Sequence, residues 1–292
     1  MRCLLTVPLT WAAMAVARLP QPALLGLGRA VAWLVLPFLP SRRRIAAINI
    51  ALCFPELDGA RQAALVRGSL VNTVVGIFEL MRAWYAPPRV LAGMARIEGM
   101  EHLREALQGG RGVLLMCGHF TPSELAARLL GEAMGRPIRA VFRPHNNACL
   151  ERWFNAARSG VFGPAIGKKD VRALLRTLLD GEPLAYSADQ NFNYQSAFVP
   201  FFGVPAATLT VTPELVRRGR AVLLPMWYRR DDDGRYTVRI GPSWDGWPSG
   251  DLTQDAARYM HELEAAVREC PDQYLWAHRR FKTRPPGEPP LY

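Results

Sequence analysis

Short apolar runs alternate with segments of helical periodicity over most of the chain, and this alternation is the strongest constraint on its fold. The apolar runs 112–117 and 138–143 are followed by 122–134 and 148–159, where apolar residues recur at helical spacing. Parallel strands need long crossover connections, and segments of this length can supply them as helices. The pattern therefore predicts an α/β fold with a mostly parallel central sheet flanked by helices.

The same periodicity extends to the rest of the chain after residue 60. The other predicted elements are helices over 61–85, 171–182, 213–220 and 251–270, a strand over 183–189, and a hairpin of 221–230 with 236–241. The hairpin is indicated by the Asp-Asp-Asp-Gly turn between its two apolar segments.

The first 50 residues differ sharply from the remainder. They contain six arginines and no acidic residue in an otherwise apolar sequence, and so hold more than half of the formal charge of +11. Apolar surface mixed with arginine and tryptophan is typical of a segment at an anionic lipid surface, whereas a nucleic-acid arm is polar and rich in lysine. We therefore expect 1–45 to form an apolar helical membrane anchor and 46–292 to form the α/β domain.

How this anchor meets the bilayer is left open by the sequence. Prolines interrupt it, and no uncharged stretch reaches the roughly 18–20 residues that cross a bilayer as a helix. An uncleaved segment that lies in the interface or crosses once is favoured. A cleaved signal peptide and a buried helical hairpin are the two alternatives.

The cysteines are scattered and odd in number, which argues against a disulfide framework and for a reducing compartment. They stand at positions 3, 53, 117, 149 and 270, without a Cys-x-x-Cys pair. No zinc-binding spacing occurs, so we expect no metal.

Polar loops follow three of the predicted strands, in the segments "CGHF", "FRPHNN" and "ADQNFN". Ligand sites in parallel sheets lie at the carboxyl ends of strands. In the first loop, His119 precedes Glu124 by five positions. A histidine can accept and return a proton near neutral pH, and a carboxylate on its other ring nitrogen would fix the tautomer. One interpretation is therefore a general base, His119, held by Glu124.

Two other interpretations of this segment remain open. Thr121, Pro122 and Glu124 fit a capping box, in which Glu124 would bond the Thr121 amide and His119 would only precede a helix. Alternatively, Cys117 and His119 could share a side of the strand end as a nucleophile pair, although a free cysteine is usually a small buried hydrophobe. The chain lacks a Gly-x-Ser-x-Gly segment, which disfavours an α/β-hydrolase.

The segment "GHFTPSE" resembles the His-x4-Asp/Glu motif of glycerolipid-type acyltransferases. From about residue 20 to its end, the chain resembles the bacterial lipid A biosynthesis acyltransferases, lauroyl/myristoyl branch. The further segments that carry this resemblance are "AAINIALCFPEL" (46–57), "VFRPHNN" (141–147), "DGEPLAYSADQNF" (180–192), "VPFFGVPAAT" (199–208) and "QYLWAHRRFKTRP" (273–285).

The resemblance implies a reaction and its participants. An acyl chain would move from acyl carrier protein, or from acyl-CoA, to a hydroxyl of a hydroxyacyl chain on a lipid A precursor. The enzyme would need no cofactor, would form no covalent intermediate and would work at the cytoplasmic face of the inner membrane. His119 would be the general base, assisted by Glu124.

The resemblance also implies which residues bind substrate. Arg143 and Arg158 would face a phosphate or the oxyanion, and Asp189 and Gln190 belong to the third motif of the family. Arginine binds phosphate through bidentate, charge-assisted hydrogen bonds. The basic end of the chain, "HRRFKTRP", would meet lipid headgroups or the acidic carrier protein.

Two rival functions stay open at this point. An acyltransferase that acts on a glycerophospholipid or another glycolipid would share the histidine motif. A non-catalytic protein that binds lipid or nucleic acid would exploit the charge alone. The apolar, proline-interrupted N-terminus disfavours a nucleic-acid partner.

Overall fold

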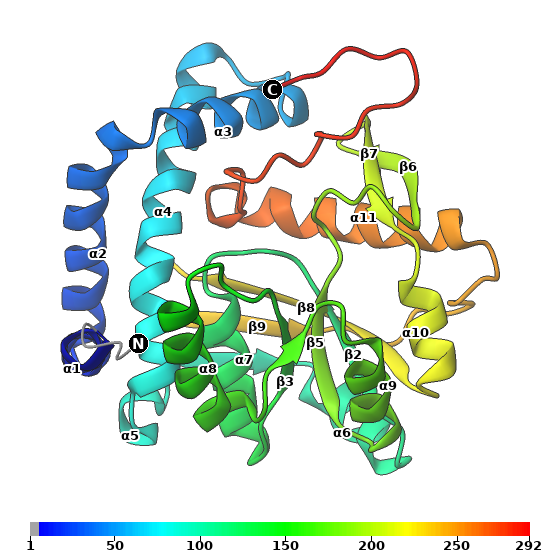
Figure 1. Cartoon of the computed structure of the whole chain (residues 1–292), viewed down its shortest axis with the longest axis horizontal. Coiled ribbons are helices and arrows are strands. Elements are labelled where there is room, and N and C mark those ends of the chain that lie inside the picture. The colour runs from blue at the N-terminus through cyan, green and yellow to red at the C-terminus, as the bar shows by residue number, and fades with distance from the viewer. Residues whose placement is uncertain (1–5) are drawn as a thin grey trace.

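A seven-stranded sheet forms the centre of the computed structural model, which describes residues 6–292 (Figure 1). The strands lie in the order β1-β9-β8-β2-β5-β3-β4. Their bounds are β1 (Ala95–Glu98), β2 (Val113–Cys117), β3 (Arg139–Phe142), β4 (Ile166–Gly167), β5 (Pro183–Ser187), β8 (Val222–Arg230) and β9 (Tyr236–Ile240). A separate antiparallel hairpin consists of β6 (Ser196–Phe201) and β7 (Val204–Leu209).

The strand β2 is the middle of this sheet. It runs parallel to β5 and β8 on its two sides, and β3 and β4 continue the parallel arrangement. All five residues of β2 are buried, as expected for a parallel strand covered on both faces. Only the β8–β9 hairpin is antiparallel within the sheet. The predicted α/β class with a mostly parallel sheet is confirmed.

The remaining helices after residue 58 are α4 (Gly59–Tyr85), α5 (Pro88–Leu91), α6 (Met100–Gln108), α7 (Ser123–Met134), α8 (Ala148–Phe162), α9 (Val171–Leu179), α10 (Thr212–Arg218), α11 (Leu252–Glu269) and the 3-10 turn η2 (Pro271–Gln273). Side-chain caps begin several of them: Asp58, Asn147, Asp170 and Asp251 each accept a main-chain N–H of the first turn. The helices predicted after residue 60 are all present.

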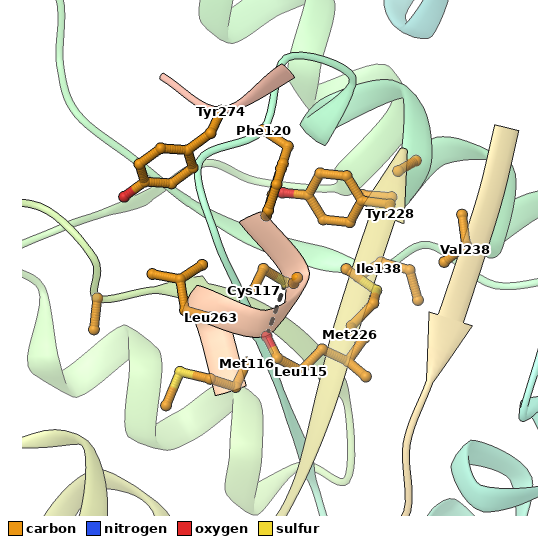
Figure 2. Close-up of a cluster of buried hydrophobic side chains, with 14 of the residues drawn as sticks. Leu115, Met116, Cys117, Phe120, Ile138, Met226, Tyr228, Val238, Leu263 and Tyr274 are labelled. Carbon is orange, nitrogen blue, oxygen red and sulfur yellow. Dashed lines mark hydrogen bonds between the residues drawn. The ribbon is translucent and has the colours of Figure 1, made fainter. Parts of the chain in front are cut away.

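Cys117 belongs to the hydrophobic core beneath the sheet end. Figure 2 shows it among Leu115, Met116, Met226 and Leu263, and its Sγ donates to the Leu115 carbonyl at 3.1 Å. Burial raises the pKa of this thiol well above its usual range, so the reactive thiolate is disfavoured. The structure therefore supports a packing role for Cys117.

The other described cysteines fall into two kinds. Cys53 and Cys270 are buried free thiols. Cys149 is disulfide-bonded, which the scattered spacing did not predict.

Three apolar helices precede α4, namely α1 (Thr6–Ala17), α2 (Gln21–Val35) and α3 (Pro40–Cys53), with the short turn η1 (Leu36–Phe38) between the last two. Figure 1 shows α2 alongside α4. Leu24 and Leu25 of α2 pack with Val75 and Phe78 of α4. A Cβ at Gly28 would lie 3.2 Å from the Val75 Cα, so a small residue permits this close approach.

The opposite side of α2 is apolar yet open. Trp33, Leu34 and Phe38 are 62%, 71% and 81% exposed. Gln21–Phe38 and Gly59–Tyr85 are both long and apolar enough to cross a membrane, with 22% and 50% of their most apolar windows buried inside the protein. Length and composition alone do not separate a membrane span from a core helix, so the anchor stays a candidate. The predicted division after residue 45 falls inside α3.

Candidate active site

His119 and Asp189 meet because two neighbouring strands end at the same edge of the sheet. Cys117, the last residue of β2, pairs with Ser187, the last residue of β5. His119 lies two positions after Cys117, and Asp189 lies two positions after Ser187. The two residues therefore follow neighbouring strand ends and lie side by side. The Asp189 Oδ2 accepts the main-chain N–H of His119 at 2.8 Å, and its Oδ1 forms a short contact with the ring Nδ1.

Opposite charge controls the protonation of this pair. Burial would lower the pKa of His119, but the adjacent charge and hydrogen bond of Asp189 raise it above its usual value of 6.5. Burial would likewise raise the pKa of Asp189, yet His119 and the hydroxyl of Tyr274 lower it to about 2. Asp189 is therefore a carboxylate at every physiological pH.

The ring of His119 keeps one nitrogen available. Its side chain is 35% exposed, whereas that of Asp189 is 1% exposed. Asp189 occupies Nδ1, and within residues 6–292 no side chain or main-chain group bonds Nε2. An imidazole with a carboxylate on one nitrogen and an open second nitrogen has the geometry of a general base.

Glu124 does not hold the ring of His119, contrary to the expected hydrogen bond. Its Oε2 accepts the indole N–H of Trp84 at 2.6 Å, and its Oε1 lies 2.7 Å from Nη2 of Arg158. The physical reason is direction: α7 begins at Ser123, so Glu124 projects from the first turn toward α4 and α8. Asp189, which was assigned to substrate binding, occupies the expected place of Glu124.

The capping box is also absent. Pro122 stands at the N-cap of α7 without a side-chain cap. The main-chain N–H of Thr121 donates to the Gln273 carbonyl at 2.9 Å, and its hydroxyl is buried without a partner. Glu124 therefore serves neither of the two roles that its spacing indicated.

Arg158 is held tightly by this second carboxylate. Its Nε and Nη2 both bond Glu124, and the two side chains are 13% and 14% exposed. The guanidinium lies 4.1 Å from the ring centroid of Phe142 and 5.1 Å from that of Phe154. Nη1 takes no part in the bonds to Glu124, so this cation is fixed with one edge left for another acceptor.

Arg143 and Gln190 differ in their relation to this pocket. Arg143 is exposed in the loop after β3 and is not among the residues that line the pocket of His119. Gln190 follows Asp189 and does line that pocket, while its carbonyl accepts a hydrogen bond from Arg280 at 3.2 Å. The structure thus brings His119, Asp189 and Gln190 together in one pocket, and Arg143 lies on an exposed loop outside its lining.

The C-terminal segment supplies the other wall of this small pocket, which sequence reasoning missed. Its lining residues beyond the three already named are Asn49, Tyr274, Leu275, Trp276, His278 and Arg280. The main-chain N–H of Leu275 donates to the His119 carbonyl at 3.0 Å, which ties the two walls together. Five of these six lie within the "QYLWAHRRFKTRP" segment, so the motif was noticed but the individual roles were not.

Two buried tyrosines and a glycine fix the turn that presents His119. Tyr259 donates to the Cys117 carbonyl and Tyr228 to the Gly118 carbonyl, both at 2.6 Å. A Cβ on Gly118 would lie 2.5 Å from the Leu263 Cδ1, so no larger residue fits there without a shift.

Residues 6–292 contain no cluster of three His, Cys, Asp or Glu side chains suited to a metal ion.

Comparison with known proteins identifies the family of this chain. The profile of the bacterial lipid A biosynthesis acyltransferases matches residues 5–283. A lipid A biosynthesis lauroyltransferase of Escherichia coli (strain K12) is 34% identical over 291 residues, which cover 97% of this chain and 94% of the relative. A palmitoleoyltransferase from the same strain is 32% identical with the same coverage. A myristoyltransferase is 27% identical over 85% of this chain and 77% of its own length. The chain therefore belongs to the bacterial lipid A biosynthesis acyltransferase family and is an acyltransferase.

Proposed function

We propose that this enzyme transfers a fatty acyl chain from acyl carrier protein to a hydroxyl of a hydroxyacyl chain on a lipid A precursor. The relatives support the acceptor, since their names specify lipid A acylation with lauroyl, palmitoleoyl and myristoyl groups. The observation that carries the chemistry is the ring of His119, held at Nδ1 by Asp189 with Nε2 open to a pocket.

In the proposed mechanism, Nε2 of His119 accepts the proton of the acceptor hydroxyl as its oxygen attacks the thioester carbonyl carbon. The tetrahedral intermediate then collapses, the carbon–sulfur bond breaks, and the leaving thiolate takes the proton back from His119. Asp189 fixes the tautomer and stabilises the imidazolium between these steps. The acyl group passes directly to the acceptor, which agrees with the burial of the nearest thiol, Cys117.

Glu124 assists this chemistry indirectly in our proposal. It orients Arg158, whose free Nη1 edge would bind a phosphate of the acceptor or the developing oxyanion. Arg143, on its exposed loop, would meet another acidic group of the acceptor or the carrier protein. No cofactor takes part, and acyl-CoA is the alternative donor.

The site would work at the cytoplasmic face of the inner membrane. The exposed apolar residues Trp33, Leu34 and Phe38 stand next to Arg42, Arg43 and Arg44 in the chain, a combination suited to an anionic lipid surface.

Exchange of both Trp33 and Phe38 for serine should weaken binding to anionic lipid vesicles by at least about tenfold. Val171→Ser, at another exposed apolar position on α9, is the control. Unchanged vesicle binding of the double variant would contradict the proposed contact of these residues with the membrane.

Acyl transfer from acyl carrier protein thioester to a purified lipid A precursor tests the function itself. His119→Ala should lower turnover by about 10³-fold or more. His261→Ala, which removes an exposed imidazole on α11, should leave turnover unchanged. Full activity of His119→Ala would overturn the assignment of the base. Preference for a glycerophospholipid acceptor in competition would favour the rival acyltransferase function.

A further inference from the structure

We propose that His278 is a second catalytic imidazole, which stays neutral and donates its Nδ1–H to the oxyanion formed on the acyl carbonyl. This inference rests on the proposed acyl transfer and adds a residue to which the sequence assigned no role. It follows from the position of the ring, from the tautomer that its neighbours impose and from its open nitrogen.

The position of His278 is fixed relative to His119. Both rings line the same pocket. The main-chain N–H of His278 donates to the Leu275 carbonyl at 3.3 Å, and Leu275 in turn donates to the His119 carbonyl at 3.0 Å. From the other side, the Asn49 side chain donates to the His278 carbonyl at 2.7 Å. The two imidazoles are thus parts of one hydrogen-bonded frame.

A main-chain amide determines the tautomer of His278. The N–H of Asn191 donates to Nε2 at 3.1 Å, and an amide N–H can only donate, so Nε2 must hold a lone pair. Asn191 is itself immobilised, because its side chain exchanges two hydrogen bonds with Thr283, at 3.0 and 2.9 Å. The proton of the neutral ring therefore resides on Nδ1.

The surroundings of His278 keep the ring neutral. Burial lowers its pKa to about 4, and the positive charges of Arg280, Arg42 and protonated His119 act in the same direction against the attraction of Asp189. At neutral pH the ring is then a hydrogen-bond donor and not an acid. A neutral imidazole of this kind can polarise a carbonyl without giving up its proton.

The Nδ1–H of His278 is free to meet a ligand. No described residue accepts a hydrogen bond from it, and it is not among the buried polar atoms that lack a partner. The Nδ1 atom is therefore not sealed from solvent, and its ring lines the same pocket as the ring of His119. An alcohol at Nε2 attacks a carbonyl beside it, and the carbonyl electron pair moves onto oxygen. A donor fixed in the same pocket stabilises that oxygen until the pair returns and expels the thiolate.

Two substitutions separate this role from a structural one. His278→Asn keeps an N–H donor near the position of Nδ1 and loses the acceptor for Asn191. His278→Gln keeps an acceptor near the position of Nε2 and loses the donor. If the donor acts on the transition state, His278→Gln should lower kcat by about 10- to 100-fold with little change in KM, and His278→Asn should lose less than about fivefold.

Both variants are to be assayed as full-length protein with acyl carrier protein thioester, and their thermal unfolding is to be measured in parallel. Near wild-type kcat in His278→Gln overturns the proposal. So does an equal loss in both folded variants, because that outcome assigns the effect to the contact with Asn191 or to the ring itself. Failure of the wild-type protein to transfer any acyl group would instead refute the proposed function, so the two failures are distinguishable.

Discussion

Two carboxylates with little solvent exposure stand at the end of this sheet, and they contact two different kinds of cation. Asp189 contacts His119, whose charge depends on pH, whereas Glu124 contacts Arg158, whose charge is permanent. Both carboxylates are largely withdrawn from solvent. Only the first can alter the basicity of a group that exchanges protons near neutral pH.

This difference shows why the nearer carboxylate in sequence is not the partner of the base. Glu124 is five residues from His119, but the start of α7 turns it toward Trp84. Asp189 is 70 residues away, yet the parallel pairing of β2 with β5 brings it to the same loop. A parallel sheet joins residues by strand order, which short sequence motifs do not record.

The largest effect should follow from Asp189→Asn, which removes the charge next to His119 and keeps the side-chain volume. Without the carboxylate, burial dominates and the pKa of His119 falls below 6.5. A base works when unprotonated, so the acidic limb of the rate profile should move to lower pH. The tautomer is no longer fixed, and turnover at neutral pH should fall by about 10³-fold.

Rate profiles from pH 5 to 9 on the acyl-transfer reaction measure both quantities. Asp170→Asn is the matched control, because Asp170 is an exposed helix cap that does not line the pocket. If Asp189→Asn keeps the wild-type turnover and the wild-type acidic limb, Asp189 is not the partner of a catalytic imidazole.

Glu124→Gln should have a smaller effect on turnover, and it should lower stability without shifting the pH dependence of the rate. Glutamine can still accept the Trp84 N–H, but it leaves Arg158 largely buried without a counter-charge. The protein should lose about 3 kcal/mol of unfolding free energy, and turnover should fall by about tenfold as Arg158 loses its orientation. The acidic limb of the rate profile should stay in place, since Glu124 does not contact the ring of His119.

Denaturant unfolding and the same rate profiles check this expectation. Glu132→Gln is the control on the same helix, where the pair with Arg128 is more exposed and should contribute less than about 1 kcal/mol. A shift of the acidic limb in Glu124→Gln as large as that in Asp189→Asn would remove the distinction between the two carboxylates.

The periodicity of apolar residues was sufficient to predict the main architecture. Burial of one face of an element imposes this pattern on its own sequence. The strands over 112–117 and 183–189 and the helices beside them could be predicted, since each carries its own apolar pattern. Among the elements that were not predicted, three strands have weak local patterns. Three of the four residues of β1 are half-buried and one is exposed, and β6 and β7 form a hairpin that contains two prolines.

The candidate site could be predicted only in part, for a related reason. His119 was selected from the polar loop after a buried strand, and Asp189 was selected through the resemblance to the family. Their proximity is a consequence of strand pairing. Asn49 and His278 lie on α3 and on the C-terminal segment, 229 residues apart in sequence, and they meet through a single hydrogen bond. Such contacts leave no periodic signal in either segment.

The smallest expected effect on turnover comes from Tyr274→Phe. The direction of its pH shift tests most directly whether Asp189 sets the basicity of His119. The Tyr274 hydroxyl donates to Asp189 and lowers the pKa of that carboxyl. Without this bond the carboxylate becomes more basic and holds the proton of His119 more firmly, so the pKa of His119 rises further. The acidic limb should then move to higher pH, opposite to its shift in Asp189→Asn, and turnover should fall by about threefold.

Phenylalanine retains the packing of Tyr274 against Phe120 and Trp276, so the stability loss should stay near 1 kcal/mol. Tyr236→Phe removes an equally buried hydroxyl that bonds Glu79 and not Asp189, and should leave the limb unmoved. Opposite shifts in the Asp189 and Tyr274 variants would mean that a single carboxylate sets the basicity of His119. Shifts in the same direction would mean that another group does so.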